Sequence, residues 1–285
     1  MTRARPSPRR STEPKSRAET KARAESRARV EADSRAALLA LSGLPAAPHP
    51  PGARIGLLGG SFNPPHDGHR HLSRLACAHL GLHEIWWLVT PQNPLKPARG
   101  MAPLPQRLVQ ARAAARRARA RGADLARVRA TDIEARLGTR YTIDSVRALK
   151  RLYPRVRFVL VIGADNLAQL VRWRGWKQLF AEVPIAIFDR PTYAAPALDS
   201  AAAEHFARWR LDARWGAKLA DRLPPAWVFF RTALDPTSST ALRARRAKSE
   251  RQVRLTRMAS SKARTSSQTG RKNQKSRSTS SPRAR

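Results

Sequence analysis

The sequence predicts an α/β fold: a doubly wound, Rossmann-like parallel sheet with helices on both faces. From about residue 54, segments typical of strands alternate with segments typical of helices, which favours parallel strands joined by crossover helices. The segment "VRFVLVIGAD" at 156–165 is almost continuously apolar, as expected of a strand buried on both faces. Ligands of such sheets bind beyond the carboxyl ends of the strands, so a site is expected in the loops that follow them.

The first half of this alternation begins with "RIGLLGG" at 54–60, which predicts a strand that enters a glycine turn. A helix is predicted at 69–82, because its apolar residues fall at helical spacing. These residues are Leu72, Leu75, Ala76 and Leu80. The next elements are predicted to be a strand at 84–90, a helix rich in alanine and arginine at 103–122, and a strand at 126–135.

The second half begins with a helix predicted at 142–153 and stopped by Pro154, which cannot continue it. After the apolar strand at 156–165, a helical segment at 166–183 is expected to break near Gly175. Two further strands are predicted at 184–189 and 226–232, and "SSTALRARR" at 238–246 opens a final helix.

The charge is unevenly distributed along the 285 residues, which contain 56 Lys and Arg against 20 Asp and Glu. We expect residues 1–50 to be a basic extension and linker, mostly disordered, because their composition is polar and proline-rich near the end. They could contain a solvated helix whose "ALLALSGL" end alone could dock. We expect residues 54–246 to form the domain, and 247–285 to be a disordered basic tail rich in Ser, Arg and Lys. Such tails attract polyanions non-specifically.

Cysteine usage and hydropathy exclude other classes. Cys77 is the one cysteine, so a disulfide framework is excluded. No apolar run approaches the roughly 20 residues that span a bilayer, and the N-terminus lacks the apolar region of a signal peptide. We therefore expect a cytoplasmic protein with no membrane partner.

The loop "GGSFNPPHDGH" at 59–69 combines glycine, proline and histidine at a strand–helix junction. Glycines after a strand let backbone N–H groups approach a phosphate, and Gly59 and Gly60 stand where this is needed. His66 and His69 are three residues apart at a helix entry, so both can face one side, and Gly68 leaves room between them. Two imidazoles beside a helix N-terminus can donate hydrogen bonds to phosphates.

Other interpretations of this loop have less support. It contains neither the GxxxxGK[ST] pattern of a P-loop nor the GxGxxG pattern of a dinucleotide site. His66, His69 and His71 could ligate a metal, but they include no pair at i,i+4 and no nearby Cys or Glu, so we assign no metal ligands. A plain structural turn would have to explain glycine, proline and histidine together.

Five further segments, in order, extend the pattern of this loop. They are "TPQNPLK" at 90–96, "RYTIDSV" at 140–146, "GADNLAQLVRW" at 163–173, "FDRP" at 188–191 and "SSTALR" at 238–243. With the loop, they resemble the motifs of the HxGH nucleotidylyltransferases and, more narrowly, of the bacterial nicotinate-nucleotide adenylyltransferase family. Three positions depart from that pattern: Arg140, Ser145, which replaces Thr, and Thr237.

The resemblance implies an enzyme of NAD biosynthesis that transfers AMP from ATP, taken with Mg²⁺, to nicotinate mononucleotide, giving deamido-NAD and pyrophosphate. It implies catalytic roles for His66, His69 and Arg243. ATP-binding roles are implied for Gly59, Gly60, Ser61, Phe62, Gly68, Gly163, Asp165 and Ser239, and nicotinate mononucleotide-binding roles for Asn93, Lys96, Thr142 and Trp173.

Alternatives stay open at this point. Another HxGH adenylyltransferase would take nicotinamide mononucleotide or pantetheine phosphate as acceptor, and the basic tails could instead bind nucleic acid. Asp165 could serve as the N-cap of the following helix, and Trp173 could pack in the core. Lys96 could be an ordinary exposed lysine.

Overall fold

The computed structural model describes residues 17–45, 49–92, 95, 100–120, 127–189 and 194–231. Its centre is a seven-stranded, all-parallel sheet in the order β3-β2-β1-β4-β5-β7-β6. The strands are β1 (Arg54–Gly60), β2 (Glu84–Val89), β3 (Arg127–Thr131), β4 (Arg157–Gly163), β5 (Ile185–Phe188), β6 (Arg210–Leu211) and β7 (Trp227–Phe230). The strand order reverses between β1 and β4, so the predicted doubly wound fold is confirmed.

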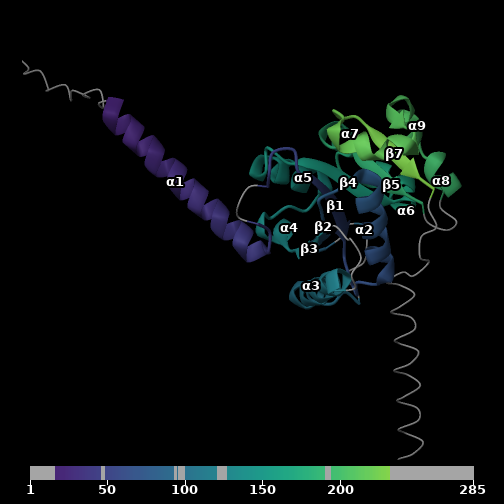
Figure 1. Cartoon of the computed structure of the whole chain (residues 1–285), viewed down its shortest axis with the longest axis horizontal. Coiled ribbons are helices and arrows are strands. Elements are labelled where there is room, and N and C mark those ends of the chain that lie inside the picture. Colours follow the sequence, from purple (N-terminus) through teal and green to yellow (C-terminus); the bar gives the residue numbers. More distant parts are fainter. Residues whose placement is uncertain are drawn as a thin grey trace, which may run out of the picture.

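Helices cover both faces of this sheet (Figure 1). One apolar layer packs α2 (Asp67–Leu80), α3 (Leu104–Ala120) and the 3₁₀ segment η3 (Ala213–Asp221) against the sheet. The opposite layer contains the shorter elements together with α5. These elements are α4 (Ile133–Arg136), α5 (Thr142–Leu152), α6 (Ala164–Ala168), η1 (Leu170–Arg172), α7 (Trp176–Glu182), α8 (Ala194–Leu198), α9 (Ala201–His205) and η2 (Ala207–Trp209).

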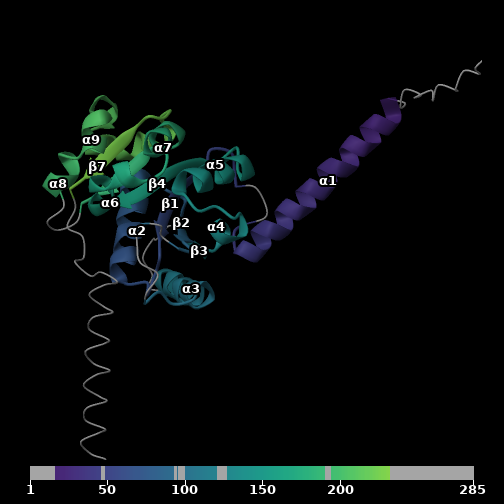
Figure 2. The same ribbon diagram turned by 180° about the vertical axis from the view of Figure 1, so that it is seen from behind.

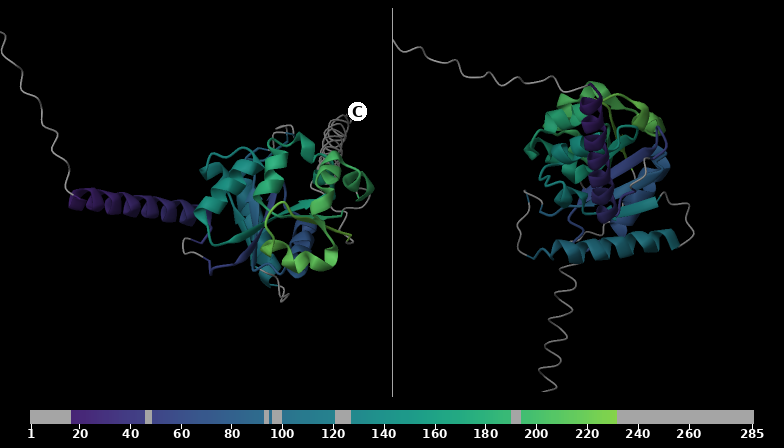
Figure 3. Two further views of the ribbon diagram at one scale, coloured as in Figure 1. Left: turned by 90° about the horizontal axis from the view of Figure 1, so that it is seen from above. Right: turned by 90° about the vertical axis from the view of Figure 1, so that its left-hand side faces the viewer.

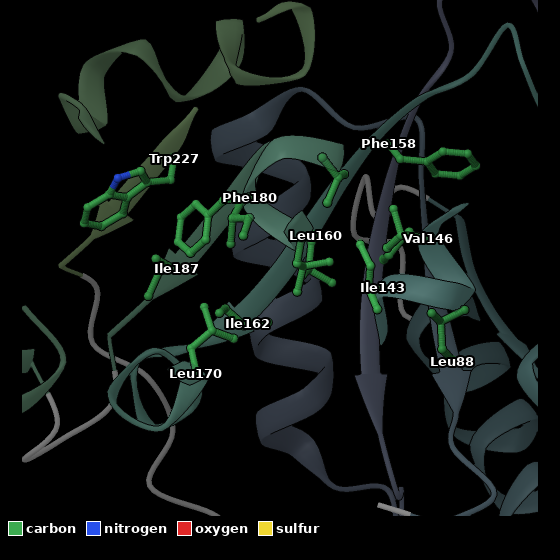
Figure 4. Packing of buried hydrophobic residues seen from close by; sticks show 14 of the residues in the cluster. Leu88, Ile143, Val146, Phe158, Leu160, Ile162, Leu170, Phe180, Ile187 and Trp227 are labelled. Atoms are coloured by element: carbon green, nitrogen blue, oxygen red, sulfur yellow. The ribbon is translucent and has the colours of Figure 1, made fainter. Parts of the chain in front are cut away.

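Alternate residues of each strand supply the two layers, because side chains of a strand point in turn to opposite faces. In β4, Phe158, Leu160 and Ile162 face one layer, and Val159 and Val161 face the other. All five are buried. The near-continuous apolar run of the sequence therefore reflects burial on both faces, and Figure 4 shows the layer that contains Leu160 and Ile162.

The N-terminal segment forms a long helix, α1 (Arg17–Ser42), so disorder does not describe that part of the extension. The helix projects from the domain in opposite views (Figure 1 and Figure 2) and in the side views of Figure 3. Its described side chains between residues 21 and 34 are exposed, whereas Leu39 and Leu44 at its end are buried. The "ALLALSGL" end therefore packs on the domain, and Arg35 just before it donates to the Leu152 carbonyl oxygen. No helix among the described residues is long and apolar enough to cross a membrane.

Two predicted strands are shorter than expected. The strand predicted at 126–135 ends at Thr131, whose hydroxyl accepts a hydrogen bond from the Ile133 N–H at 3.1 Å, and α4 follows. The strand predicted at 156–165 ends at Gly163. The break predicted near Gly175 is confirmed, because this residue adopts a φ of 66° and α7 begins after it. The short elements between 194 and 221 were not predicted.

Candidate active site

The predicted phosphate loop begins where the strand order reverses. Leu57 of β1 pairs with Leu160 of β4, and each strand ends three residues later, at Gly60 and Gly163. Two neighbouring strands thus end at one level, which is where doubly wound sheets bind ligands. Gly59 is exposed, and a Cβ built on it would meet nothing within 4 Å. The structure therefore leaves space at this end of β1.

The loop backbone has an uncommon conformation at Phe62, whose φ is 45°. A bulky residue rarely adopts the left-handed region, and such strain concentrates at functional sites. The Phe62 ring is buried and fills the space beside Gly60, where a Cβ would lie 3.2 Å from the ring. A side chain at position 60 would therefore crowd the Phe62 ring, which would have to shift by a few tenths of an ångström.

His66 and His69 lie together at the start of α2, with ring centroids 3.9 Å apart. His66 is the N-cap residue and is buried. The Nδ1 atom of His69 accepts a hydrogen bond from the His66 backbone N–H at 3.2 Å. In the neutral imidazole of His69 this contact leaves the proton on Nε2, which can donate to a ligand. The predicted pair is therefore brought together and one donor is oriented.

The His69 ring is supported from beneath by aromatic residues. The Phe62 ring lies 4.6 Å from it and stacks on Trp87 at 5.0 Å. The Trp87 indole N–H donates to the Ser73 hydroxyl, which donates to the His69 carbonyl oxygen, each at 2.8 Å. Phe62 is only 1% exposed, so its ring supports the His69 ring from within the protein.

The second strand end carries Gly163 and Asp165. Gly163 is the N-cap residue of α6, and Asp165 lies in the first turn of that helix. The alternative that Asp165 is itself the N-cap is therefore wrong. Asp165 lies at the carboxyl edge of the sheet and is partly exposed, although its Oδ1 atom is buried.

The start of α5 contacts the segment that follows η1. Thr142 is the first residue of α5, and Trp173 is the C-cap residue of η1. The residues next to them meet, because the Arg174 guanidinium lies 4.7 Å from the centre of the Tyr141 ring. Trp173 is partly exposed and packs against the core, and its stacking role stays a prediction. Asn93, Lys96, Ser239 and Arg243 lie outside the described residues.

Comparison with known proteins places this geometry in a family. Residues 57–245 match the family described as cytidylyltransferase-like. The probable nicotinate-nucleotide adenylyltransferase of Ruegeria pomeroyi is 49% identical over 194 residues, 68% of this chain and 87% of that protein. The one of Gluconacetobacter diazotrophicus is 49% identical over 191 residues, 67% of this chain and 85% of that protein. The chain belongs to the nicotinate-nucleotide adenylyltransferase family.

Among solved structures, nicotinic acid mononucleotide adenylyltransferase of Plasmodium falciparum complexed with NaAD aligns with a TM-score of 0.48 and 16% identity. The alignment covers 65% of this chain and 77% of that one. This likeness is too distant to carry an argument about the site.

One position where this family member departs from the family motif has a buried partner. The Ser145 hydroxyl donates to the Glu134 carboxyl at 2.8 Å and lies 2.9 Å from the Thr139 hydroxyl. Burial raises the pKa of Glu134, and hydrogen bonds from Ser145 and Thr90 lower it by less. Ser145 thus supplies a hydroxyl to this buried carboxyl, as a threonine at this position also could.

Sequence reasoning missed two residues that hold the adenylyltransferase loops in place, Arg107 and Asn63. Arg107 is 1% exposed and donates to backbone carbonyls of both loops. No pattern singles it out within an arginine-rich helix. Asn63 stands inside the quoted motif, and its place in a proline-containing turn was the only available signal.

Proposed function

We propose that this chain transfers AMP from ATP to nicotinate mononucleotide, giving deamido-NAD and pyrophosphate. The observation that carries the proposal is the pair formed by His66 and His69 at the point where the strand order reverses. Relatives that are 49% identical and carry the name of this activity support it. The acceptor follows from these relatives, because the histidine pair by itself is compatible with several mononucleotides.

In this reaction an oxygen of the mononucleotide's own phosphate attacks the α-phosphorus of ATP. The bond between the α-phosphorus and the bridging oxygen breaks, and pyrophosphate leaves. No serine, cysteine or lysine nucleophile is needed, so catalysis consists of positioning and charge stabilisation. His66 and His69 would donate to the ATP phosphates. The N-terminus of α2, which has 14 residues, adds a favourable dipole.

The ends of β1 and β4 would hold the rest of ATP. Backbone groups of Gly59, Gly60 and Ser61 would contact the phosphates, and Gly68 would let the nucleotide lie close to α2. Gly163 would allow close approach at β4, and the Asp165 carboxylate would accept a hydrogen bond from a ribose hydroxyl. Phe62 would act by supporting the His69 ring.

The mononucleotide would lie toward α5 and η1. The first turn of α5 has backbone N–H groups without partners inside the helix. The backbone N–H and the hydroxyl of Thr142 would donate to the nicotinate carboxylate. Trp173 would stack on the pyridine ring. Asn93 and Lys96 are proposed to contribute further contacts on this side, and Ser239 and Arg243 to bind the phosphates of ATP and the leaving pyrophosphate.

Mg²⁺ would be held mainly by the substrate. Among the described residues, no group of three or more His, Cys, Asp or Glu side chains could hold a metal ion. Phosphate oxygens of ATP and water molecules would supply the ligands of the ion, as they often do for Mg²⁺. When bound, it would neutralise charge on the polyphosphate.

The proposal is tested by pyrophosphate release from ATP with nicotinate mononucleotide, nicotinamide mononucleotide or pantetheine phosphate as acceptor. We expect kcat/KM to be highest with nicotinate mononucleotide. A higher value with either of the other acceptors would assign the chain a different substrate. No release with any acceptor would contradict adenylyl transfer itself.

A further inference from the structure

Arg107, on α3, is a buried cation whose partners are all backbone carbonyl oxygens. Its Nη1 atom donates to Ser61 at 2.7 Å and to Thr90 at 2.8 Å. Its Nη2 atom donates to Pro91 and its Nε atom to Ala102, each at 2.8 Å. One planar group therefore joins the loop after β1, the loop after β2 and the turn before α3.

Asn63 holds the same region from the other side. Its amide Nδ2 donates to the Gly100 carbonyl at 2.9 Å, and its Oδ1 accepts from the Ala102 N–H at 3.2 Å. Asn63 and Arg107 thus bind the N–H and the C=O of the same residue, Ala102. Since Arg107 also binds the Pro91 carbonyl, the pair fixes both flanks of the segment between 91 and 102.

The carbonyl partners of Arg107 suit a residue that positions the two loops. Arginine presents its donors in a rigid fork, so four carbonyl oxygens around it can occupy only one arrangement. Among the described residues, Arg107 forms no ion pair with a carboxylate. Its positive charge is therefore not neutralised locally, and it lies behind the loop proposed to hold phosphates.

We propose that Arg107 is a positioning residue that, together with Asn63, fixes the flanks of the loop after β2 relative to the loop after β1. The described flanks are Thr90 and Pro91 on one side and Gly100 and Ala102 on the other. The proposal rests on the proposed function, because it assigns the two loops to the two substrates of one reaction. Attack on the α-phosphorus requires the two substrates to be aligned, and a displacement of about 1 Å can cost about 10²-fold in rate. Arg107 would set this alignment without touching either substrate.

Arg112 offers a matched control on the same helix. It also donates to backbone carbonyls, to Ala130 at 3.3 Å and to Ser42 at 3.1 Å. These contacts join α3 to β3 and to the end of α1, away from both loops. Replacing Arg112 with methionine removes the same guanidinium and tests stability alone.

The experiment compares Arg107→Met, Arg107→Lys, Asn63→Ala and Arg112→Met in the full chain. We expect Arg107→Met to lower kcat/KM for the mononucleotide about 10²-fold and to raise its KM. Arg107→Lys keeps the charge without the fork, so we expect a loss of about tenfold. Asn63→Ala should also lower kcat/KM for the mononucleotide about tenfold. The kcat/KM of Arg112→Met should stay within about twofold of the wild-type value.

Two kinetic outcomes would overturn the proposal. One is an Arg107→Met enzyme with kcat/KM within about twofold of the wild type. The other is a lower apparent kcat with both KM values unchanged and a matching loss of folded protein, since that pattern reports folding alone. If Arg107→Met does not fold, Arg107→Lys and Asn63→Ala decide the question by the same criteria.

Hydrogen exchange separates failure of this proposal from failure of the proposed function. Peptides covering 86–92 and 100–106 should exchange faster in Arg107→Met and Asn63→Ala than in the wild type, and at the wild-type rate in Arg112→Met. Unchanged exchange in the first two variants would refute the coupling of the loops. If the wild type transfers no AMP, the proposed function fails, and the exchange rates still decide whether Arg107 fixes the loops.

Discussion

The two edges of the sheet treat an arginine guanidinium in opposite ways: Arg107 is buried and Arg129 is partly exposed. At the carboxyl edge, Arg107 is surrounded by the carbonyl oxygens of four residues. Toward the amino edge, Arg129 of β3 donates two hydrogen bonds to the Glu84 carboxylate, at 2.8 and 2.9 Å. Glu84 is the first residue of β2 and also accepts from the Trp86 indole N–H at 3.0 Å. Within the part of the chain that the structure describes, the cation at the carboxyl edge has no counter-ion, and the cation toward the amino edge is paired with a carboxylate.

The amino edge is also closed by the N-terminal extension. The His49 ring lies near Trp86 and Tyr153, and its Nε2 atom is 3.9 Å from the Glu84 carboxylate. The Tyr153 hydroxyl donates to the Pro45 carbonyl at 3.0 Å. Ion pairing and packing therefore stabilise this edge, whereas the carboxyl edge retains space and unneutralised positive charge where phosphates are proposed to bind.

The largest effect on the carboxyl edge is expected from His69→Ala. Loss of one preorganised donor should lower kcat by about 10²-fold or more. The unfolding midpoint should change little, because the His69 ring is partly exposed. Steady-state kinetics and a thermal melt measure the two quantities. Near-normal kcat would remove His69 from the phosphate site, and His66→Ala provides the same test for its neighbour.

The corresponding change at the amino edge is Glu84→Gln, which should affect stability and spare catalysis. Glu84 is buried but Arg129 is partly exposed, so we expect loss of this charge to cost about 2 kcal/mol of unfolding free energy. Burial opposes ionisation of Glu84, but hydrogen bonds from Arg129 and Trp86 prevail and lower its pKa. Its stabilisation is thus present above the ordinary value of 4.5 and is lost as the pH falls through the lower folded value.

Urea unfolding at pH 7 and near pH 3 would measure this difference. The difference in unfolding free energy between the wild type and Glu84→Gln should be smaller at the lower pH. Two outcomes would contradict the division between the two edges. One is a Glu84→Gln variant as stable as the wild type at pH 7, and the other is a variant whose kcat falls although its folded fraction is unchanged.

Trp173→Ala should have a moderate effect that is specific to one substrate. Loss of stacking is expected to raise the KM for nicotinate mononucleotide about tenfold and to leave the KM for ATP nearly unchanged. Initial rates with each substrate varied in turn provide the measurement. Equal changes in both KM values would assign Trp173 to core packing.

The smallest effect is expected from Glu134→Gln, a buried carboxyl on the carboxyl side of the sheet. Because burial raises its pKa, the wild type loses stability as the pH rises from 4.5 toward the folded value. Glutamine keeps an acceptor for Ser145 and does not titrate. Relative to wild type, the variant should therefore gain unfolding free energy as the pH rises from 4.5 through the folded pKa of Glu134, which urea unfolding across a pH range would measure. A constant difference across this range would show that Glu134 does not titrate in it.

The sequence predicted the regular elements better than the irregular ones. Strands such as 54–60 and the helix starting at Thr142 have clear apolar periodicity, and the structure has them at those places. The prediction of a strand to 135 was wrong, because the Thr131 hydroxyl caps a turn that no periodicity reveals. The short elements from 194 to 221 are held by contacts with distant residues, such as the Trp227 indole, which donates to Phe206 at 2.7 Å.

By itself the sequence determined the fold class and the proximity of His66 and His69, because strand–helix alternation and the spacing of the two histidines act through local backbone geometry. The phosphate-binding role of their loop stays a prediction. The tertiary structure alone decided which arginine is buried among carbonyls and which is paired with a carboxylate. Arg107 and Arg112 are indistinguishable by local pattern, and Arg129 meets Glu84 from 45 residues away. The surroundings of a charge are set by residues that are distant in sequence, so its role becomes visible only when the chain is folded.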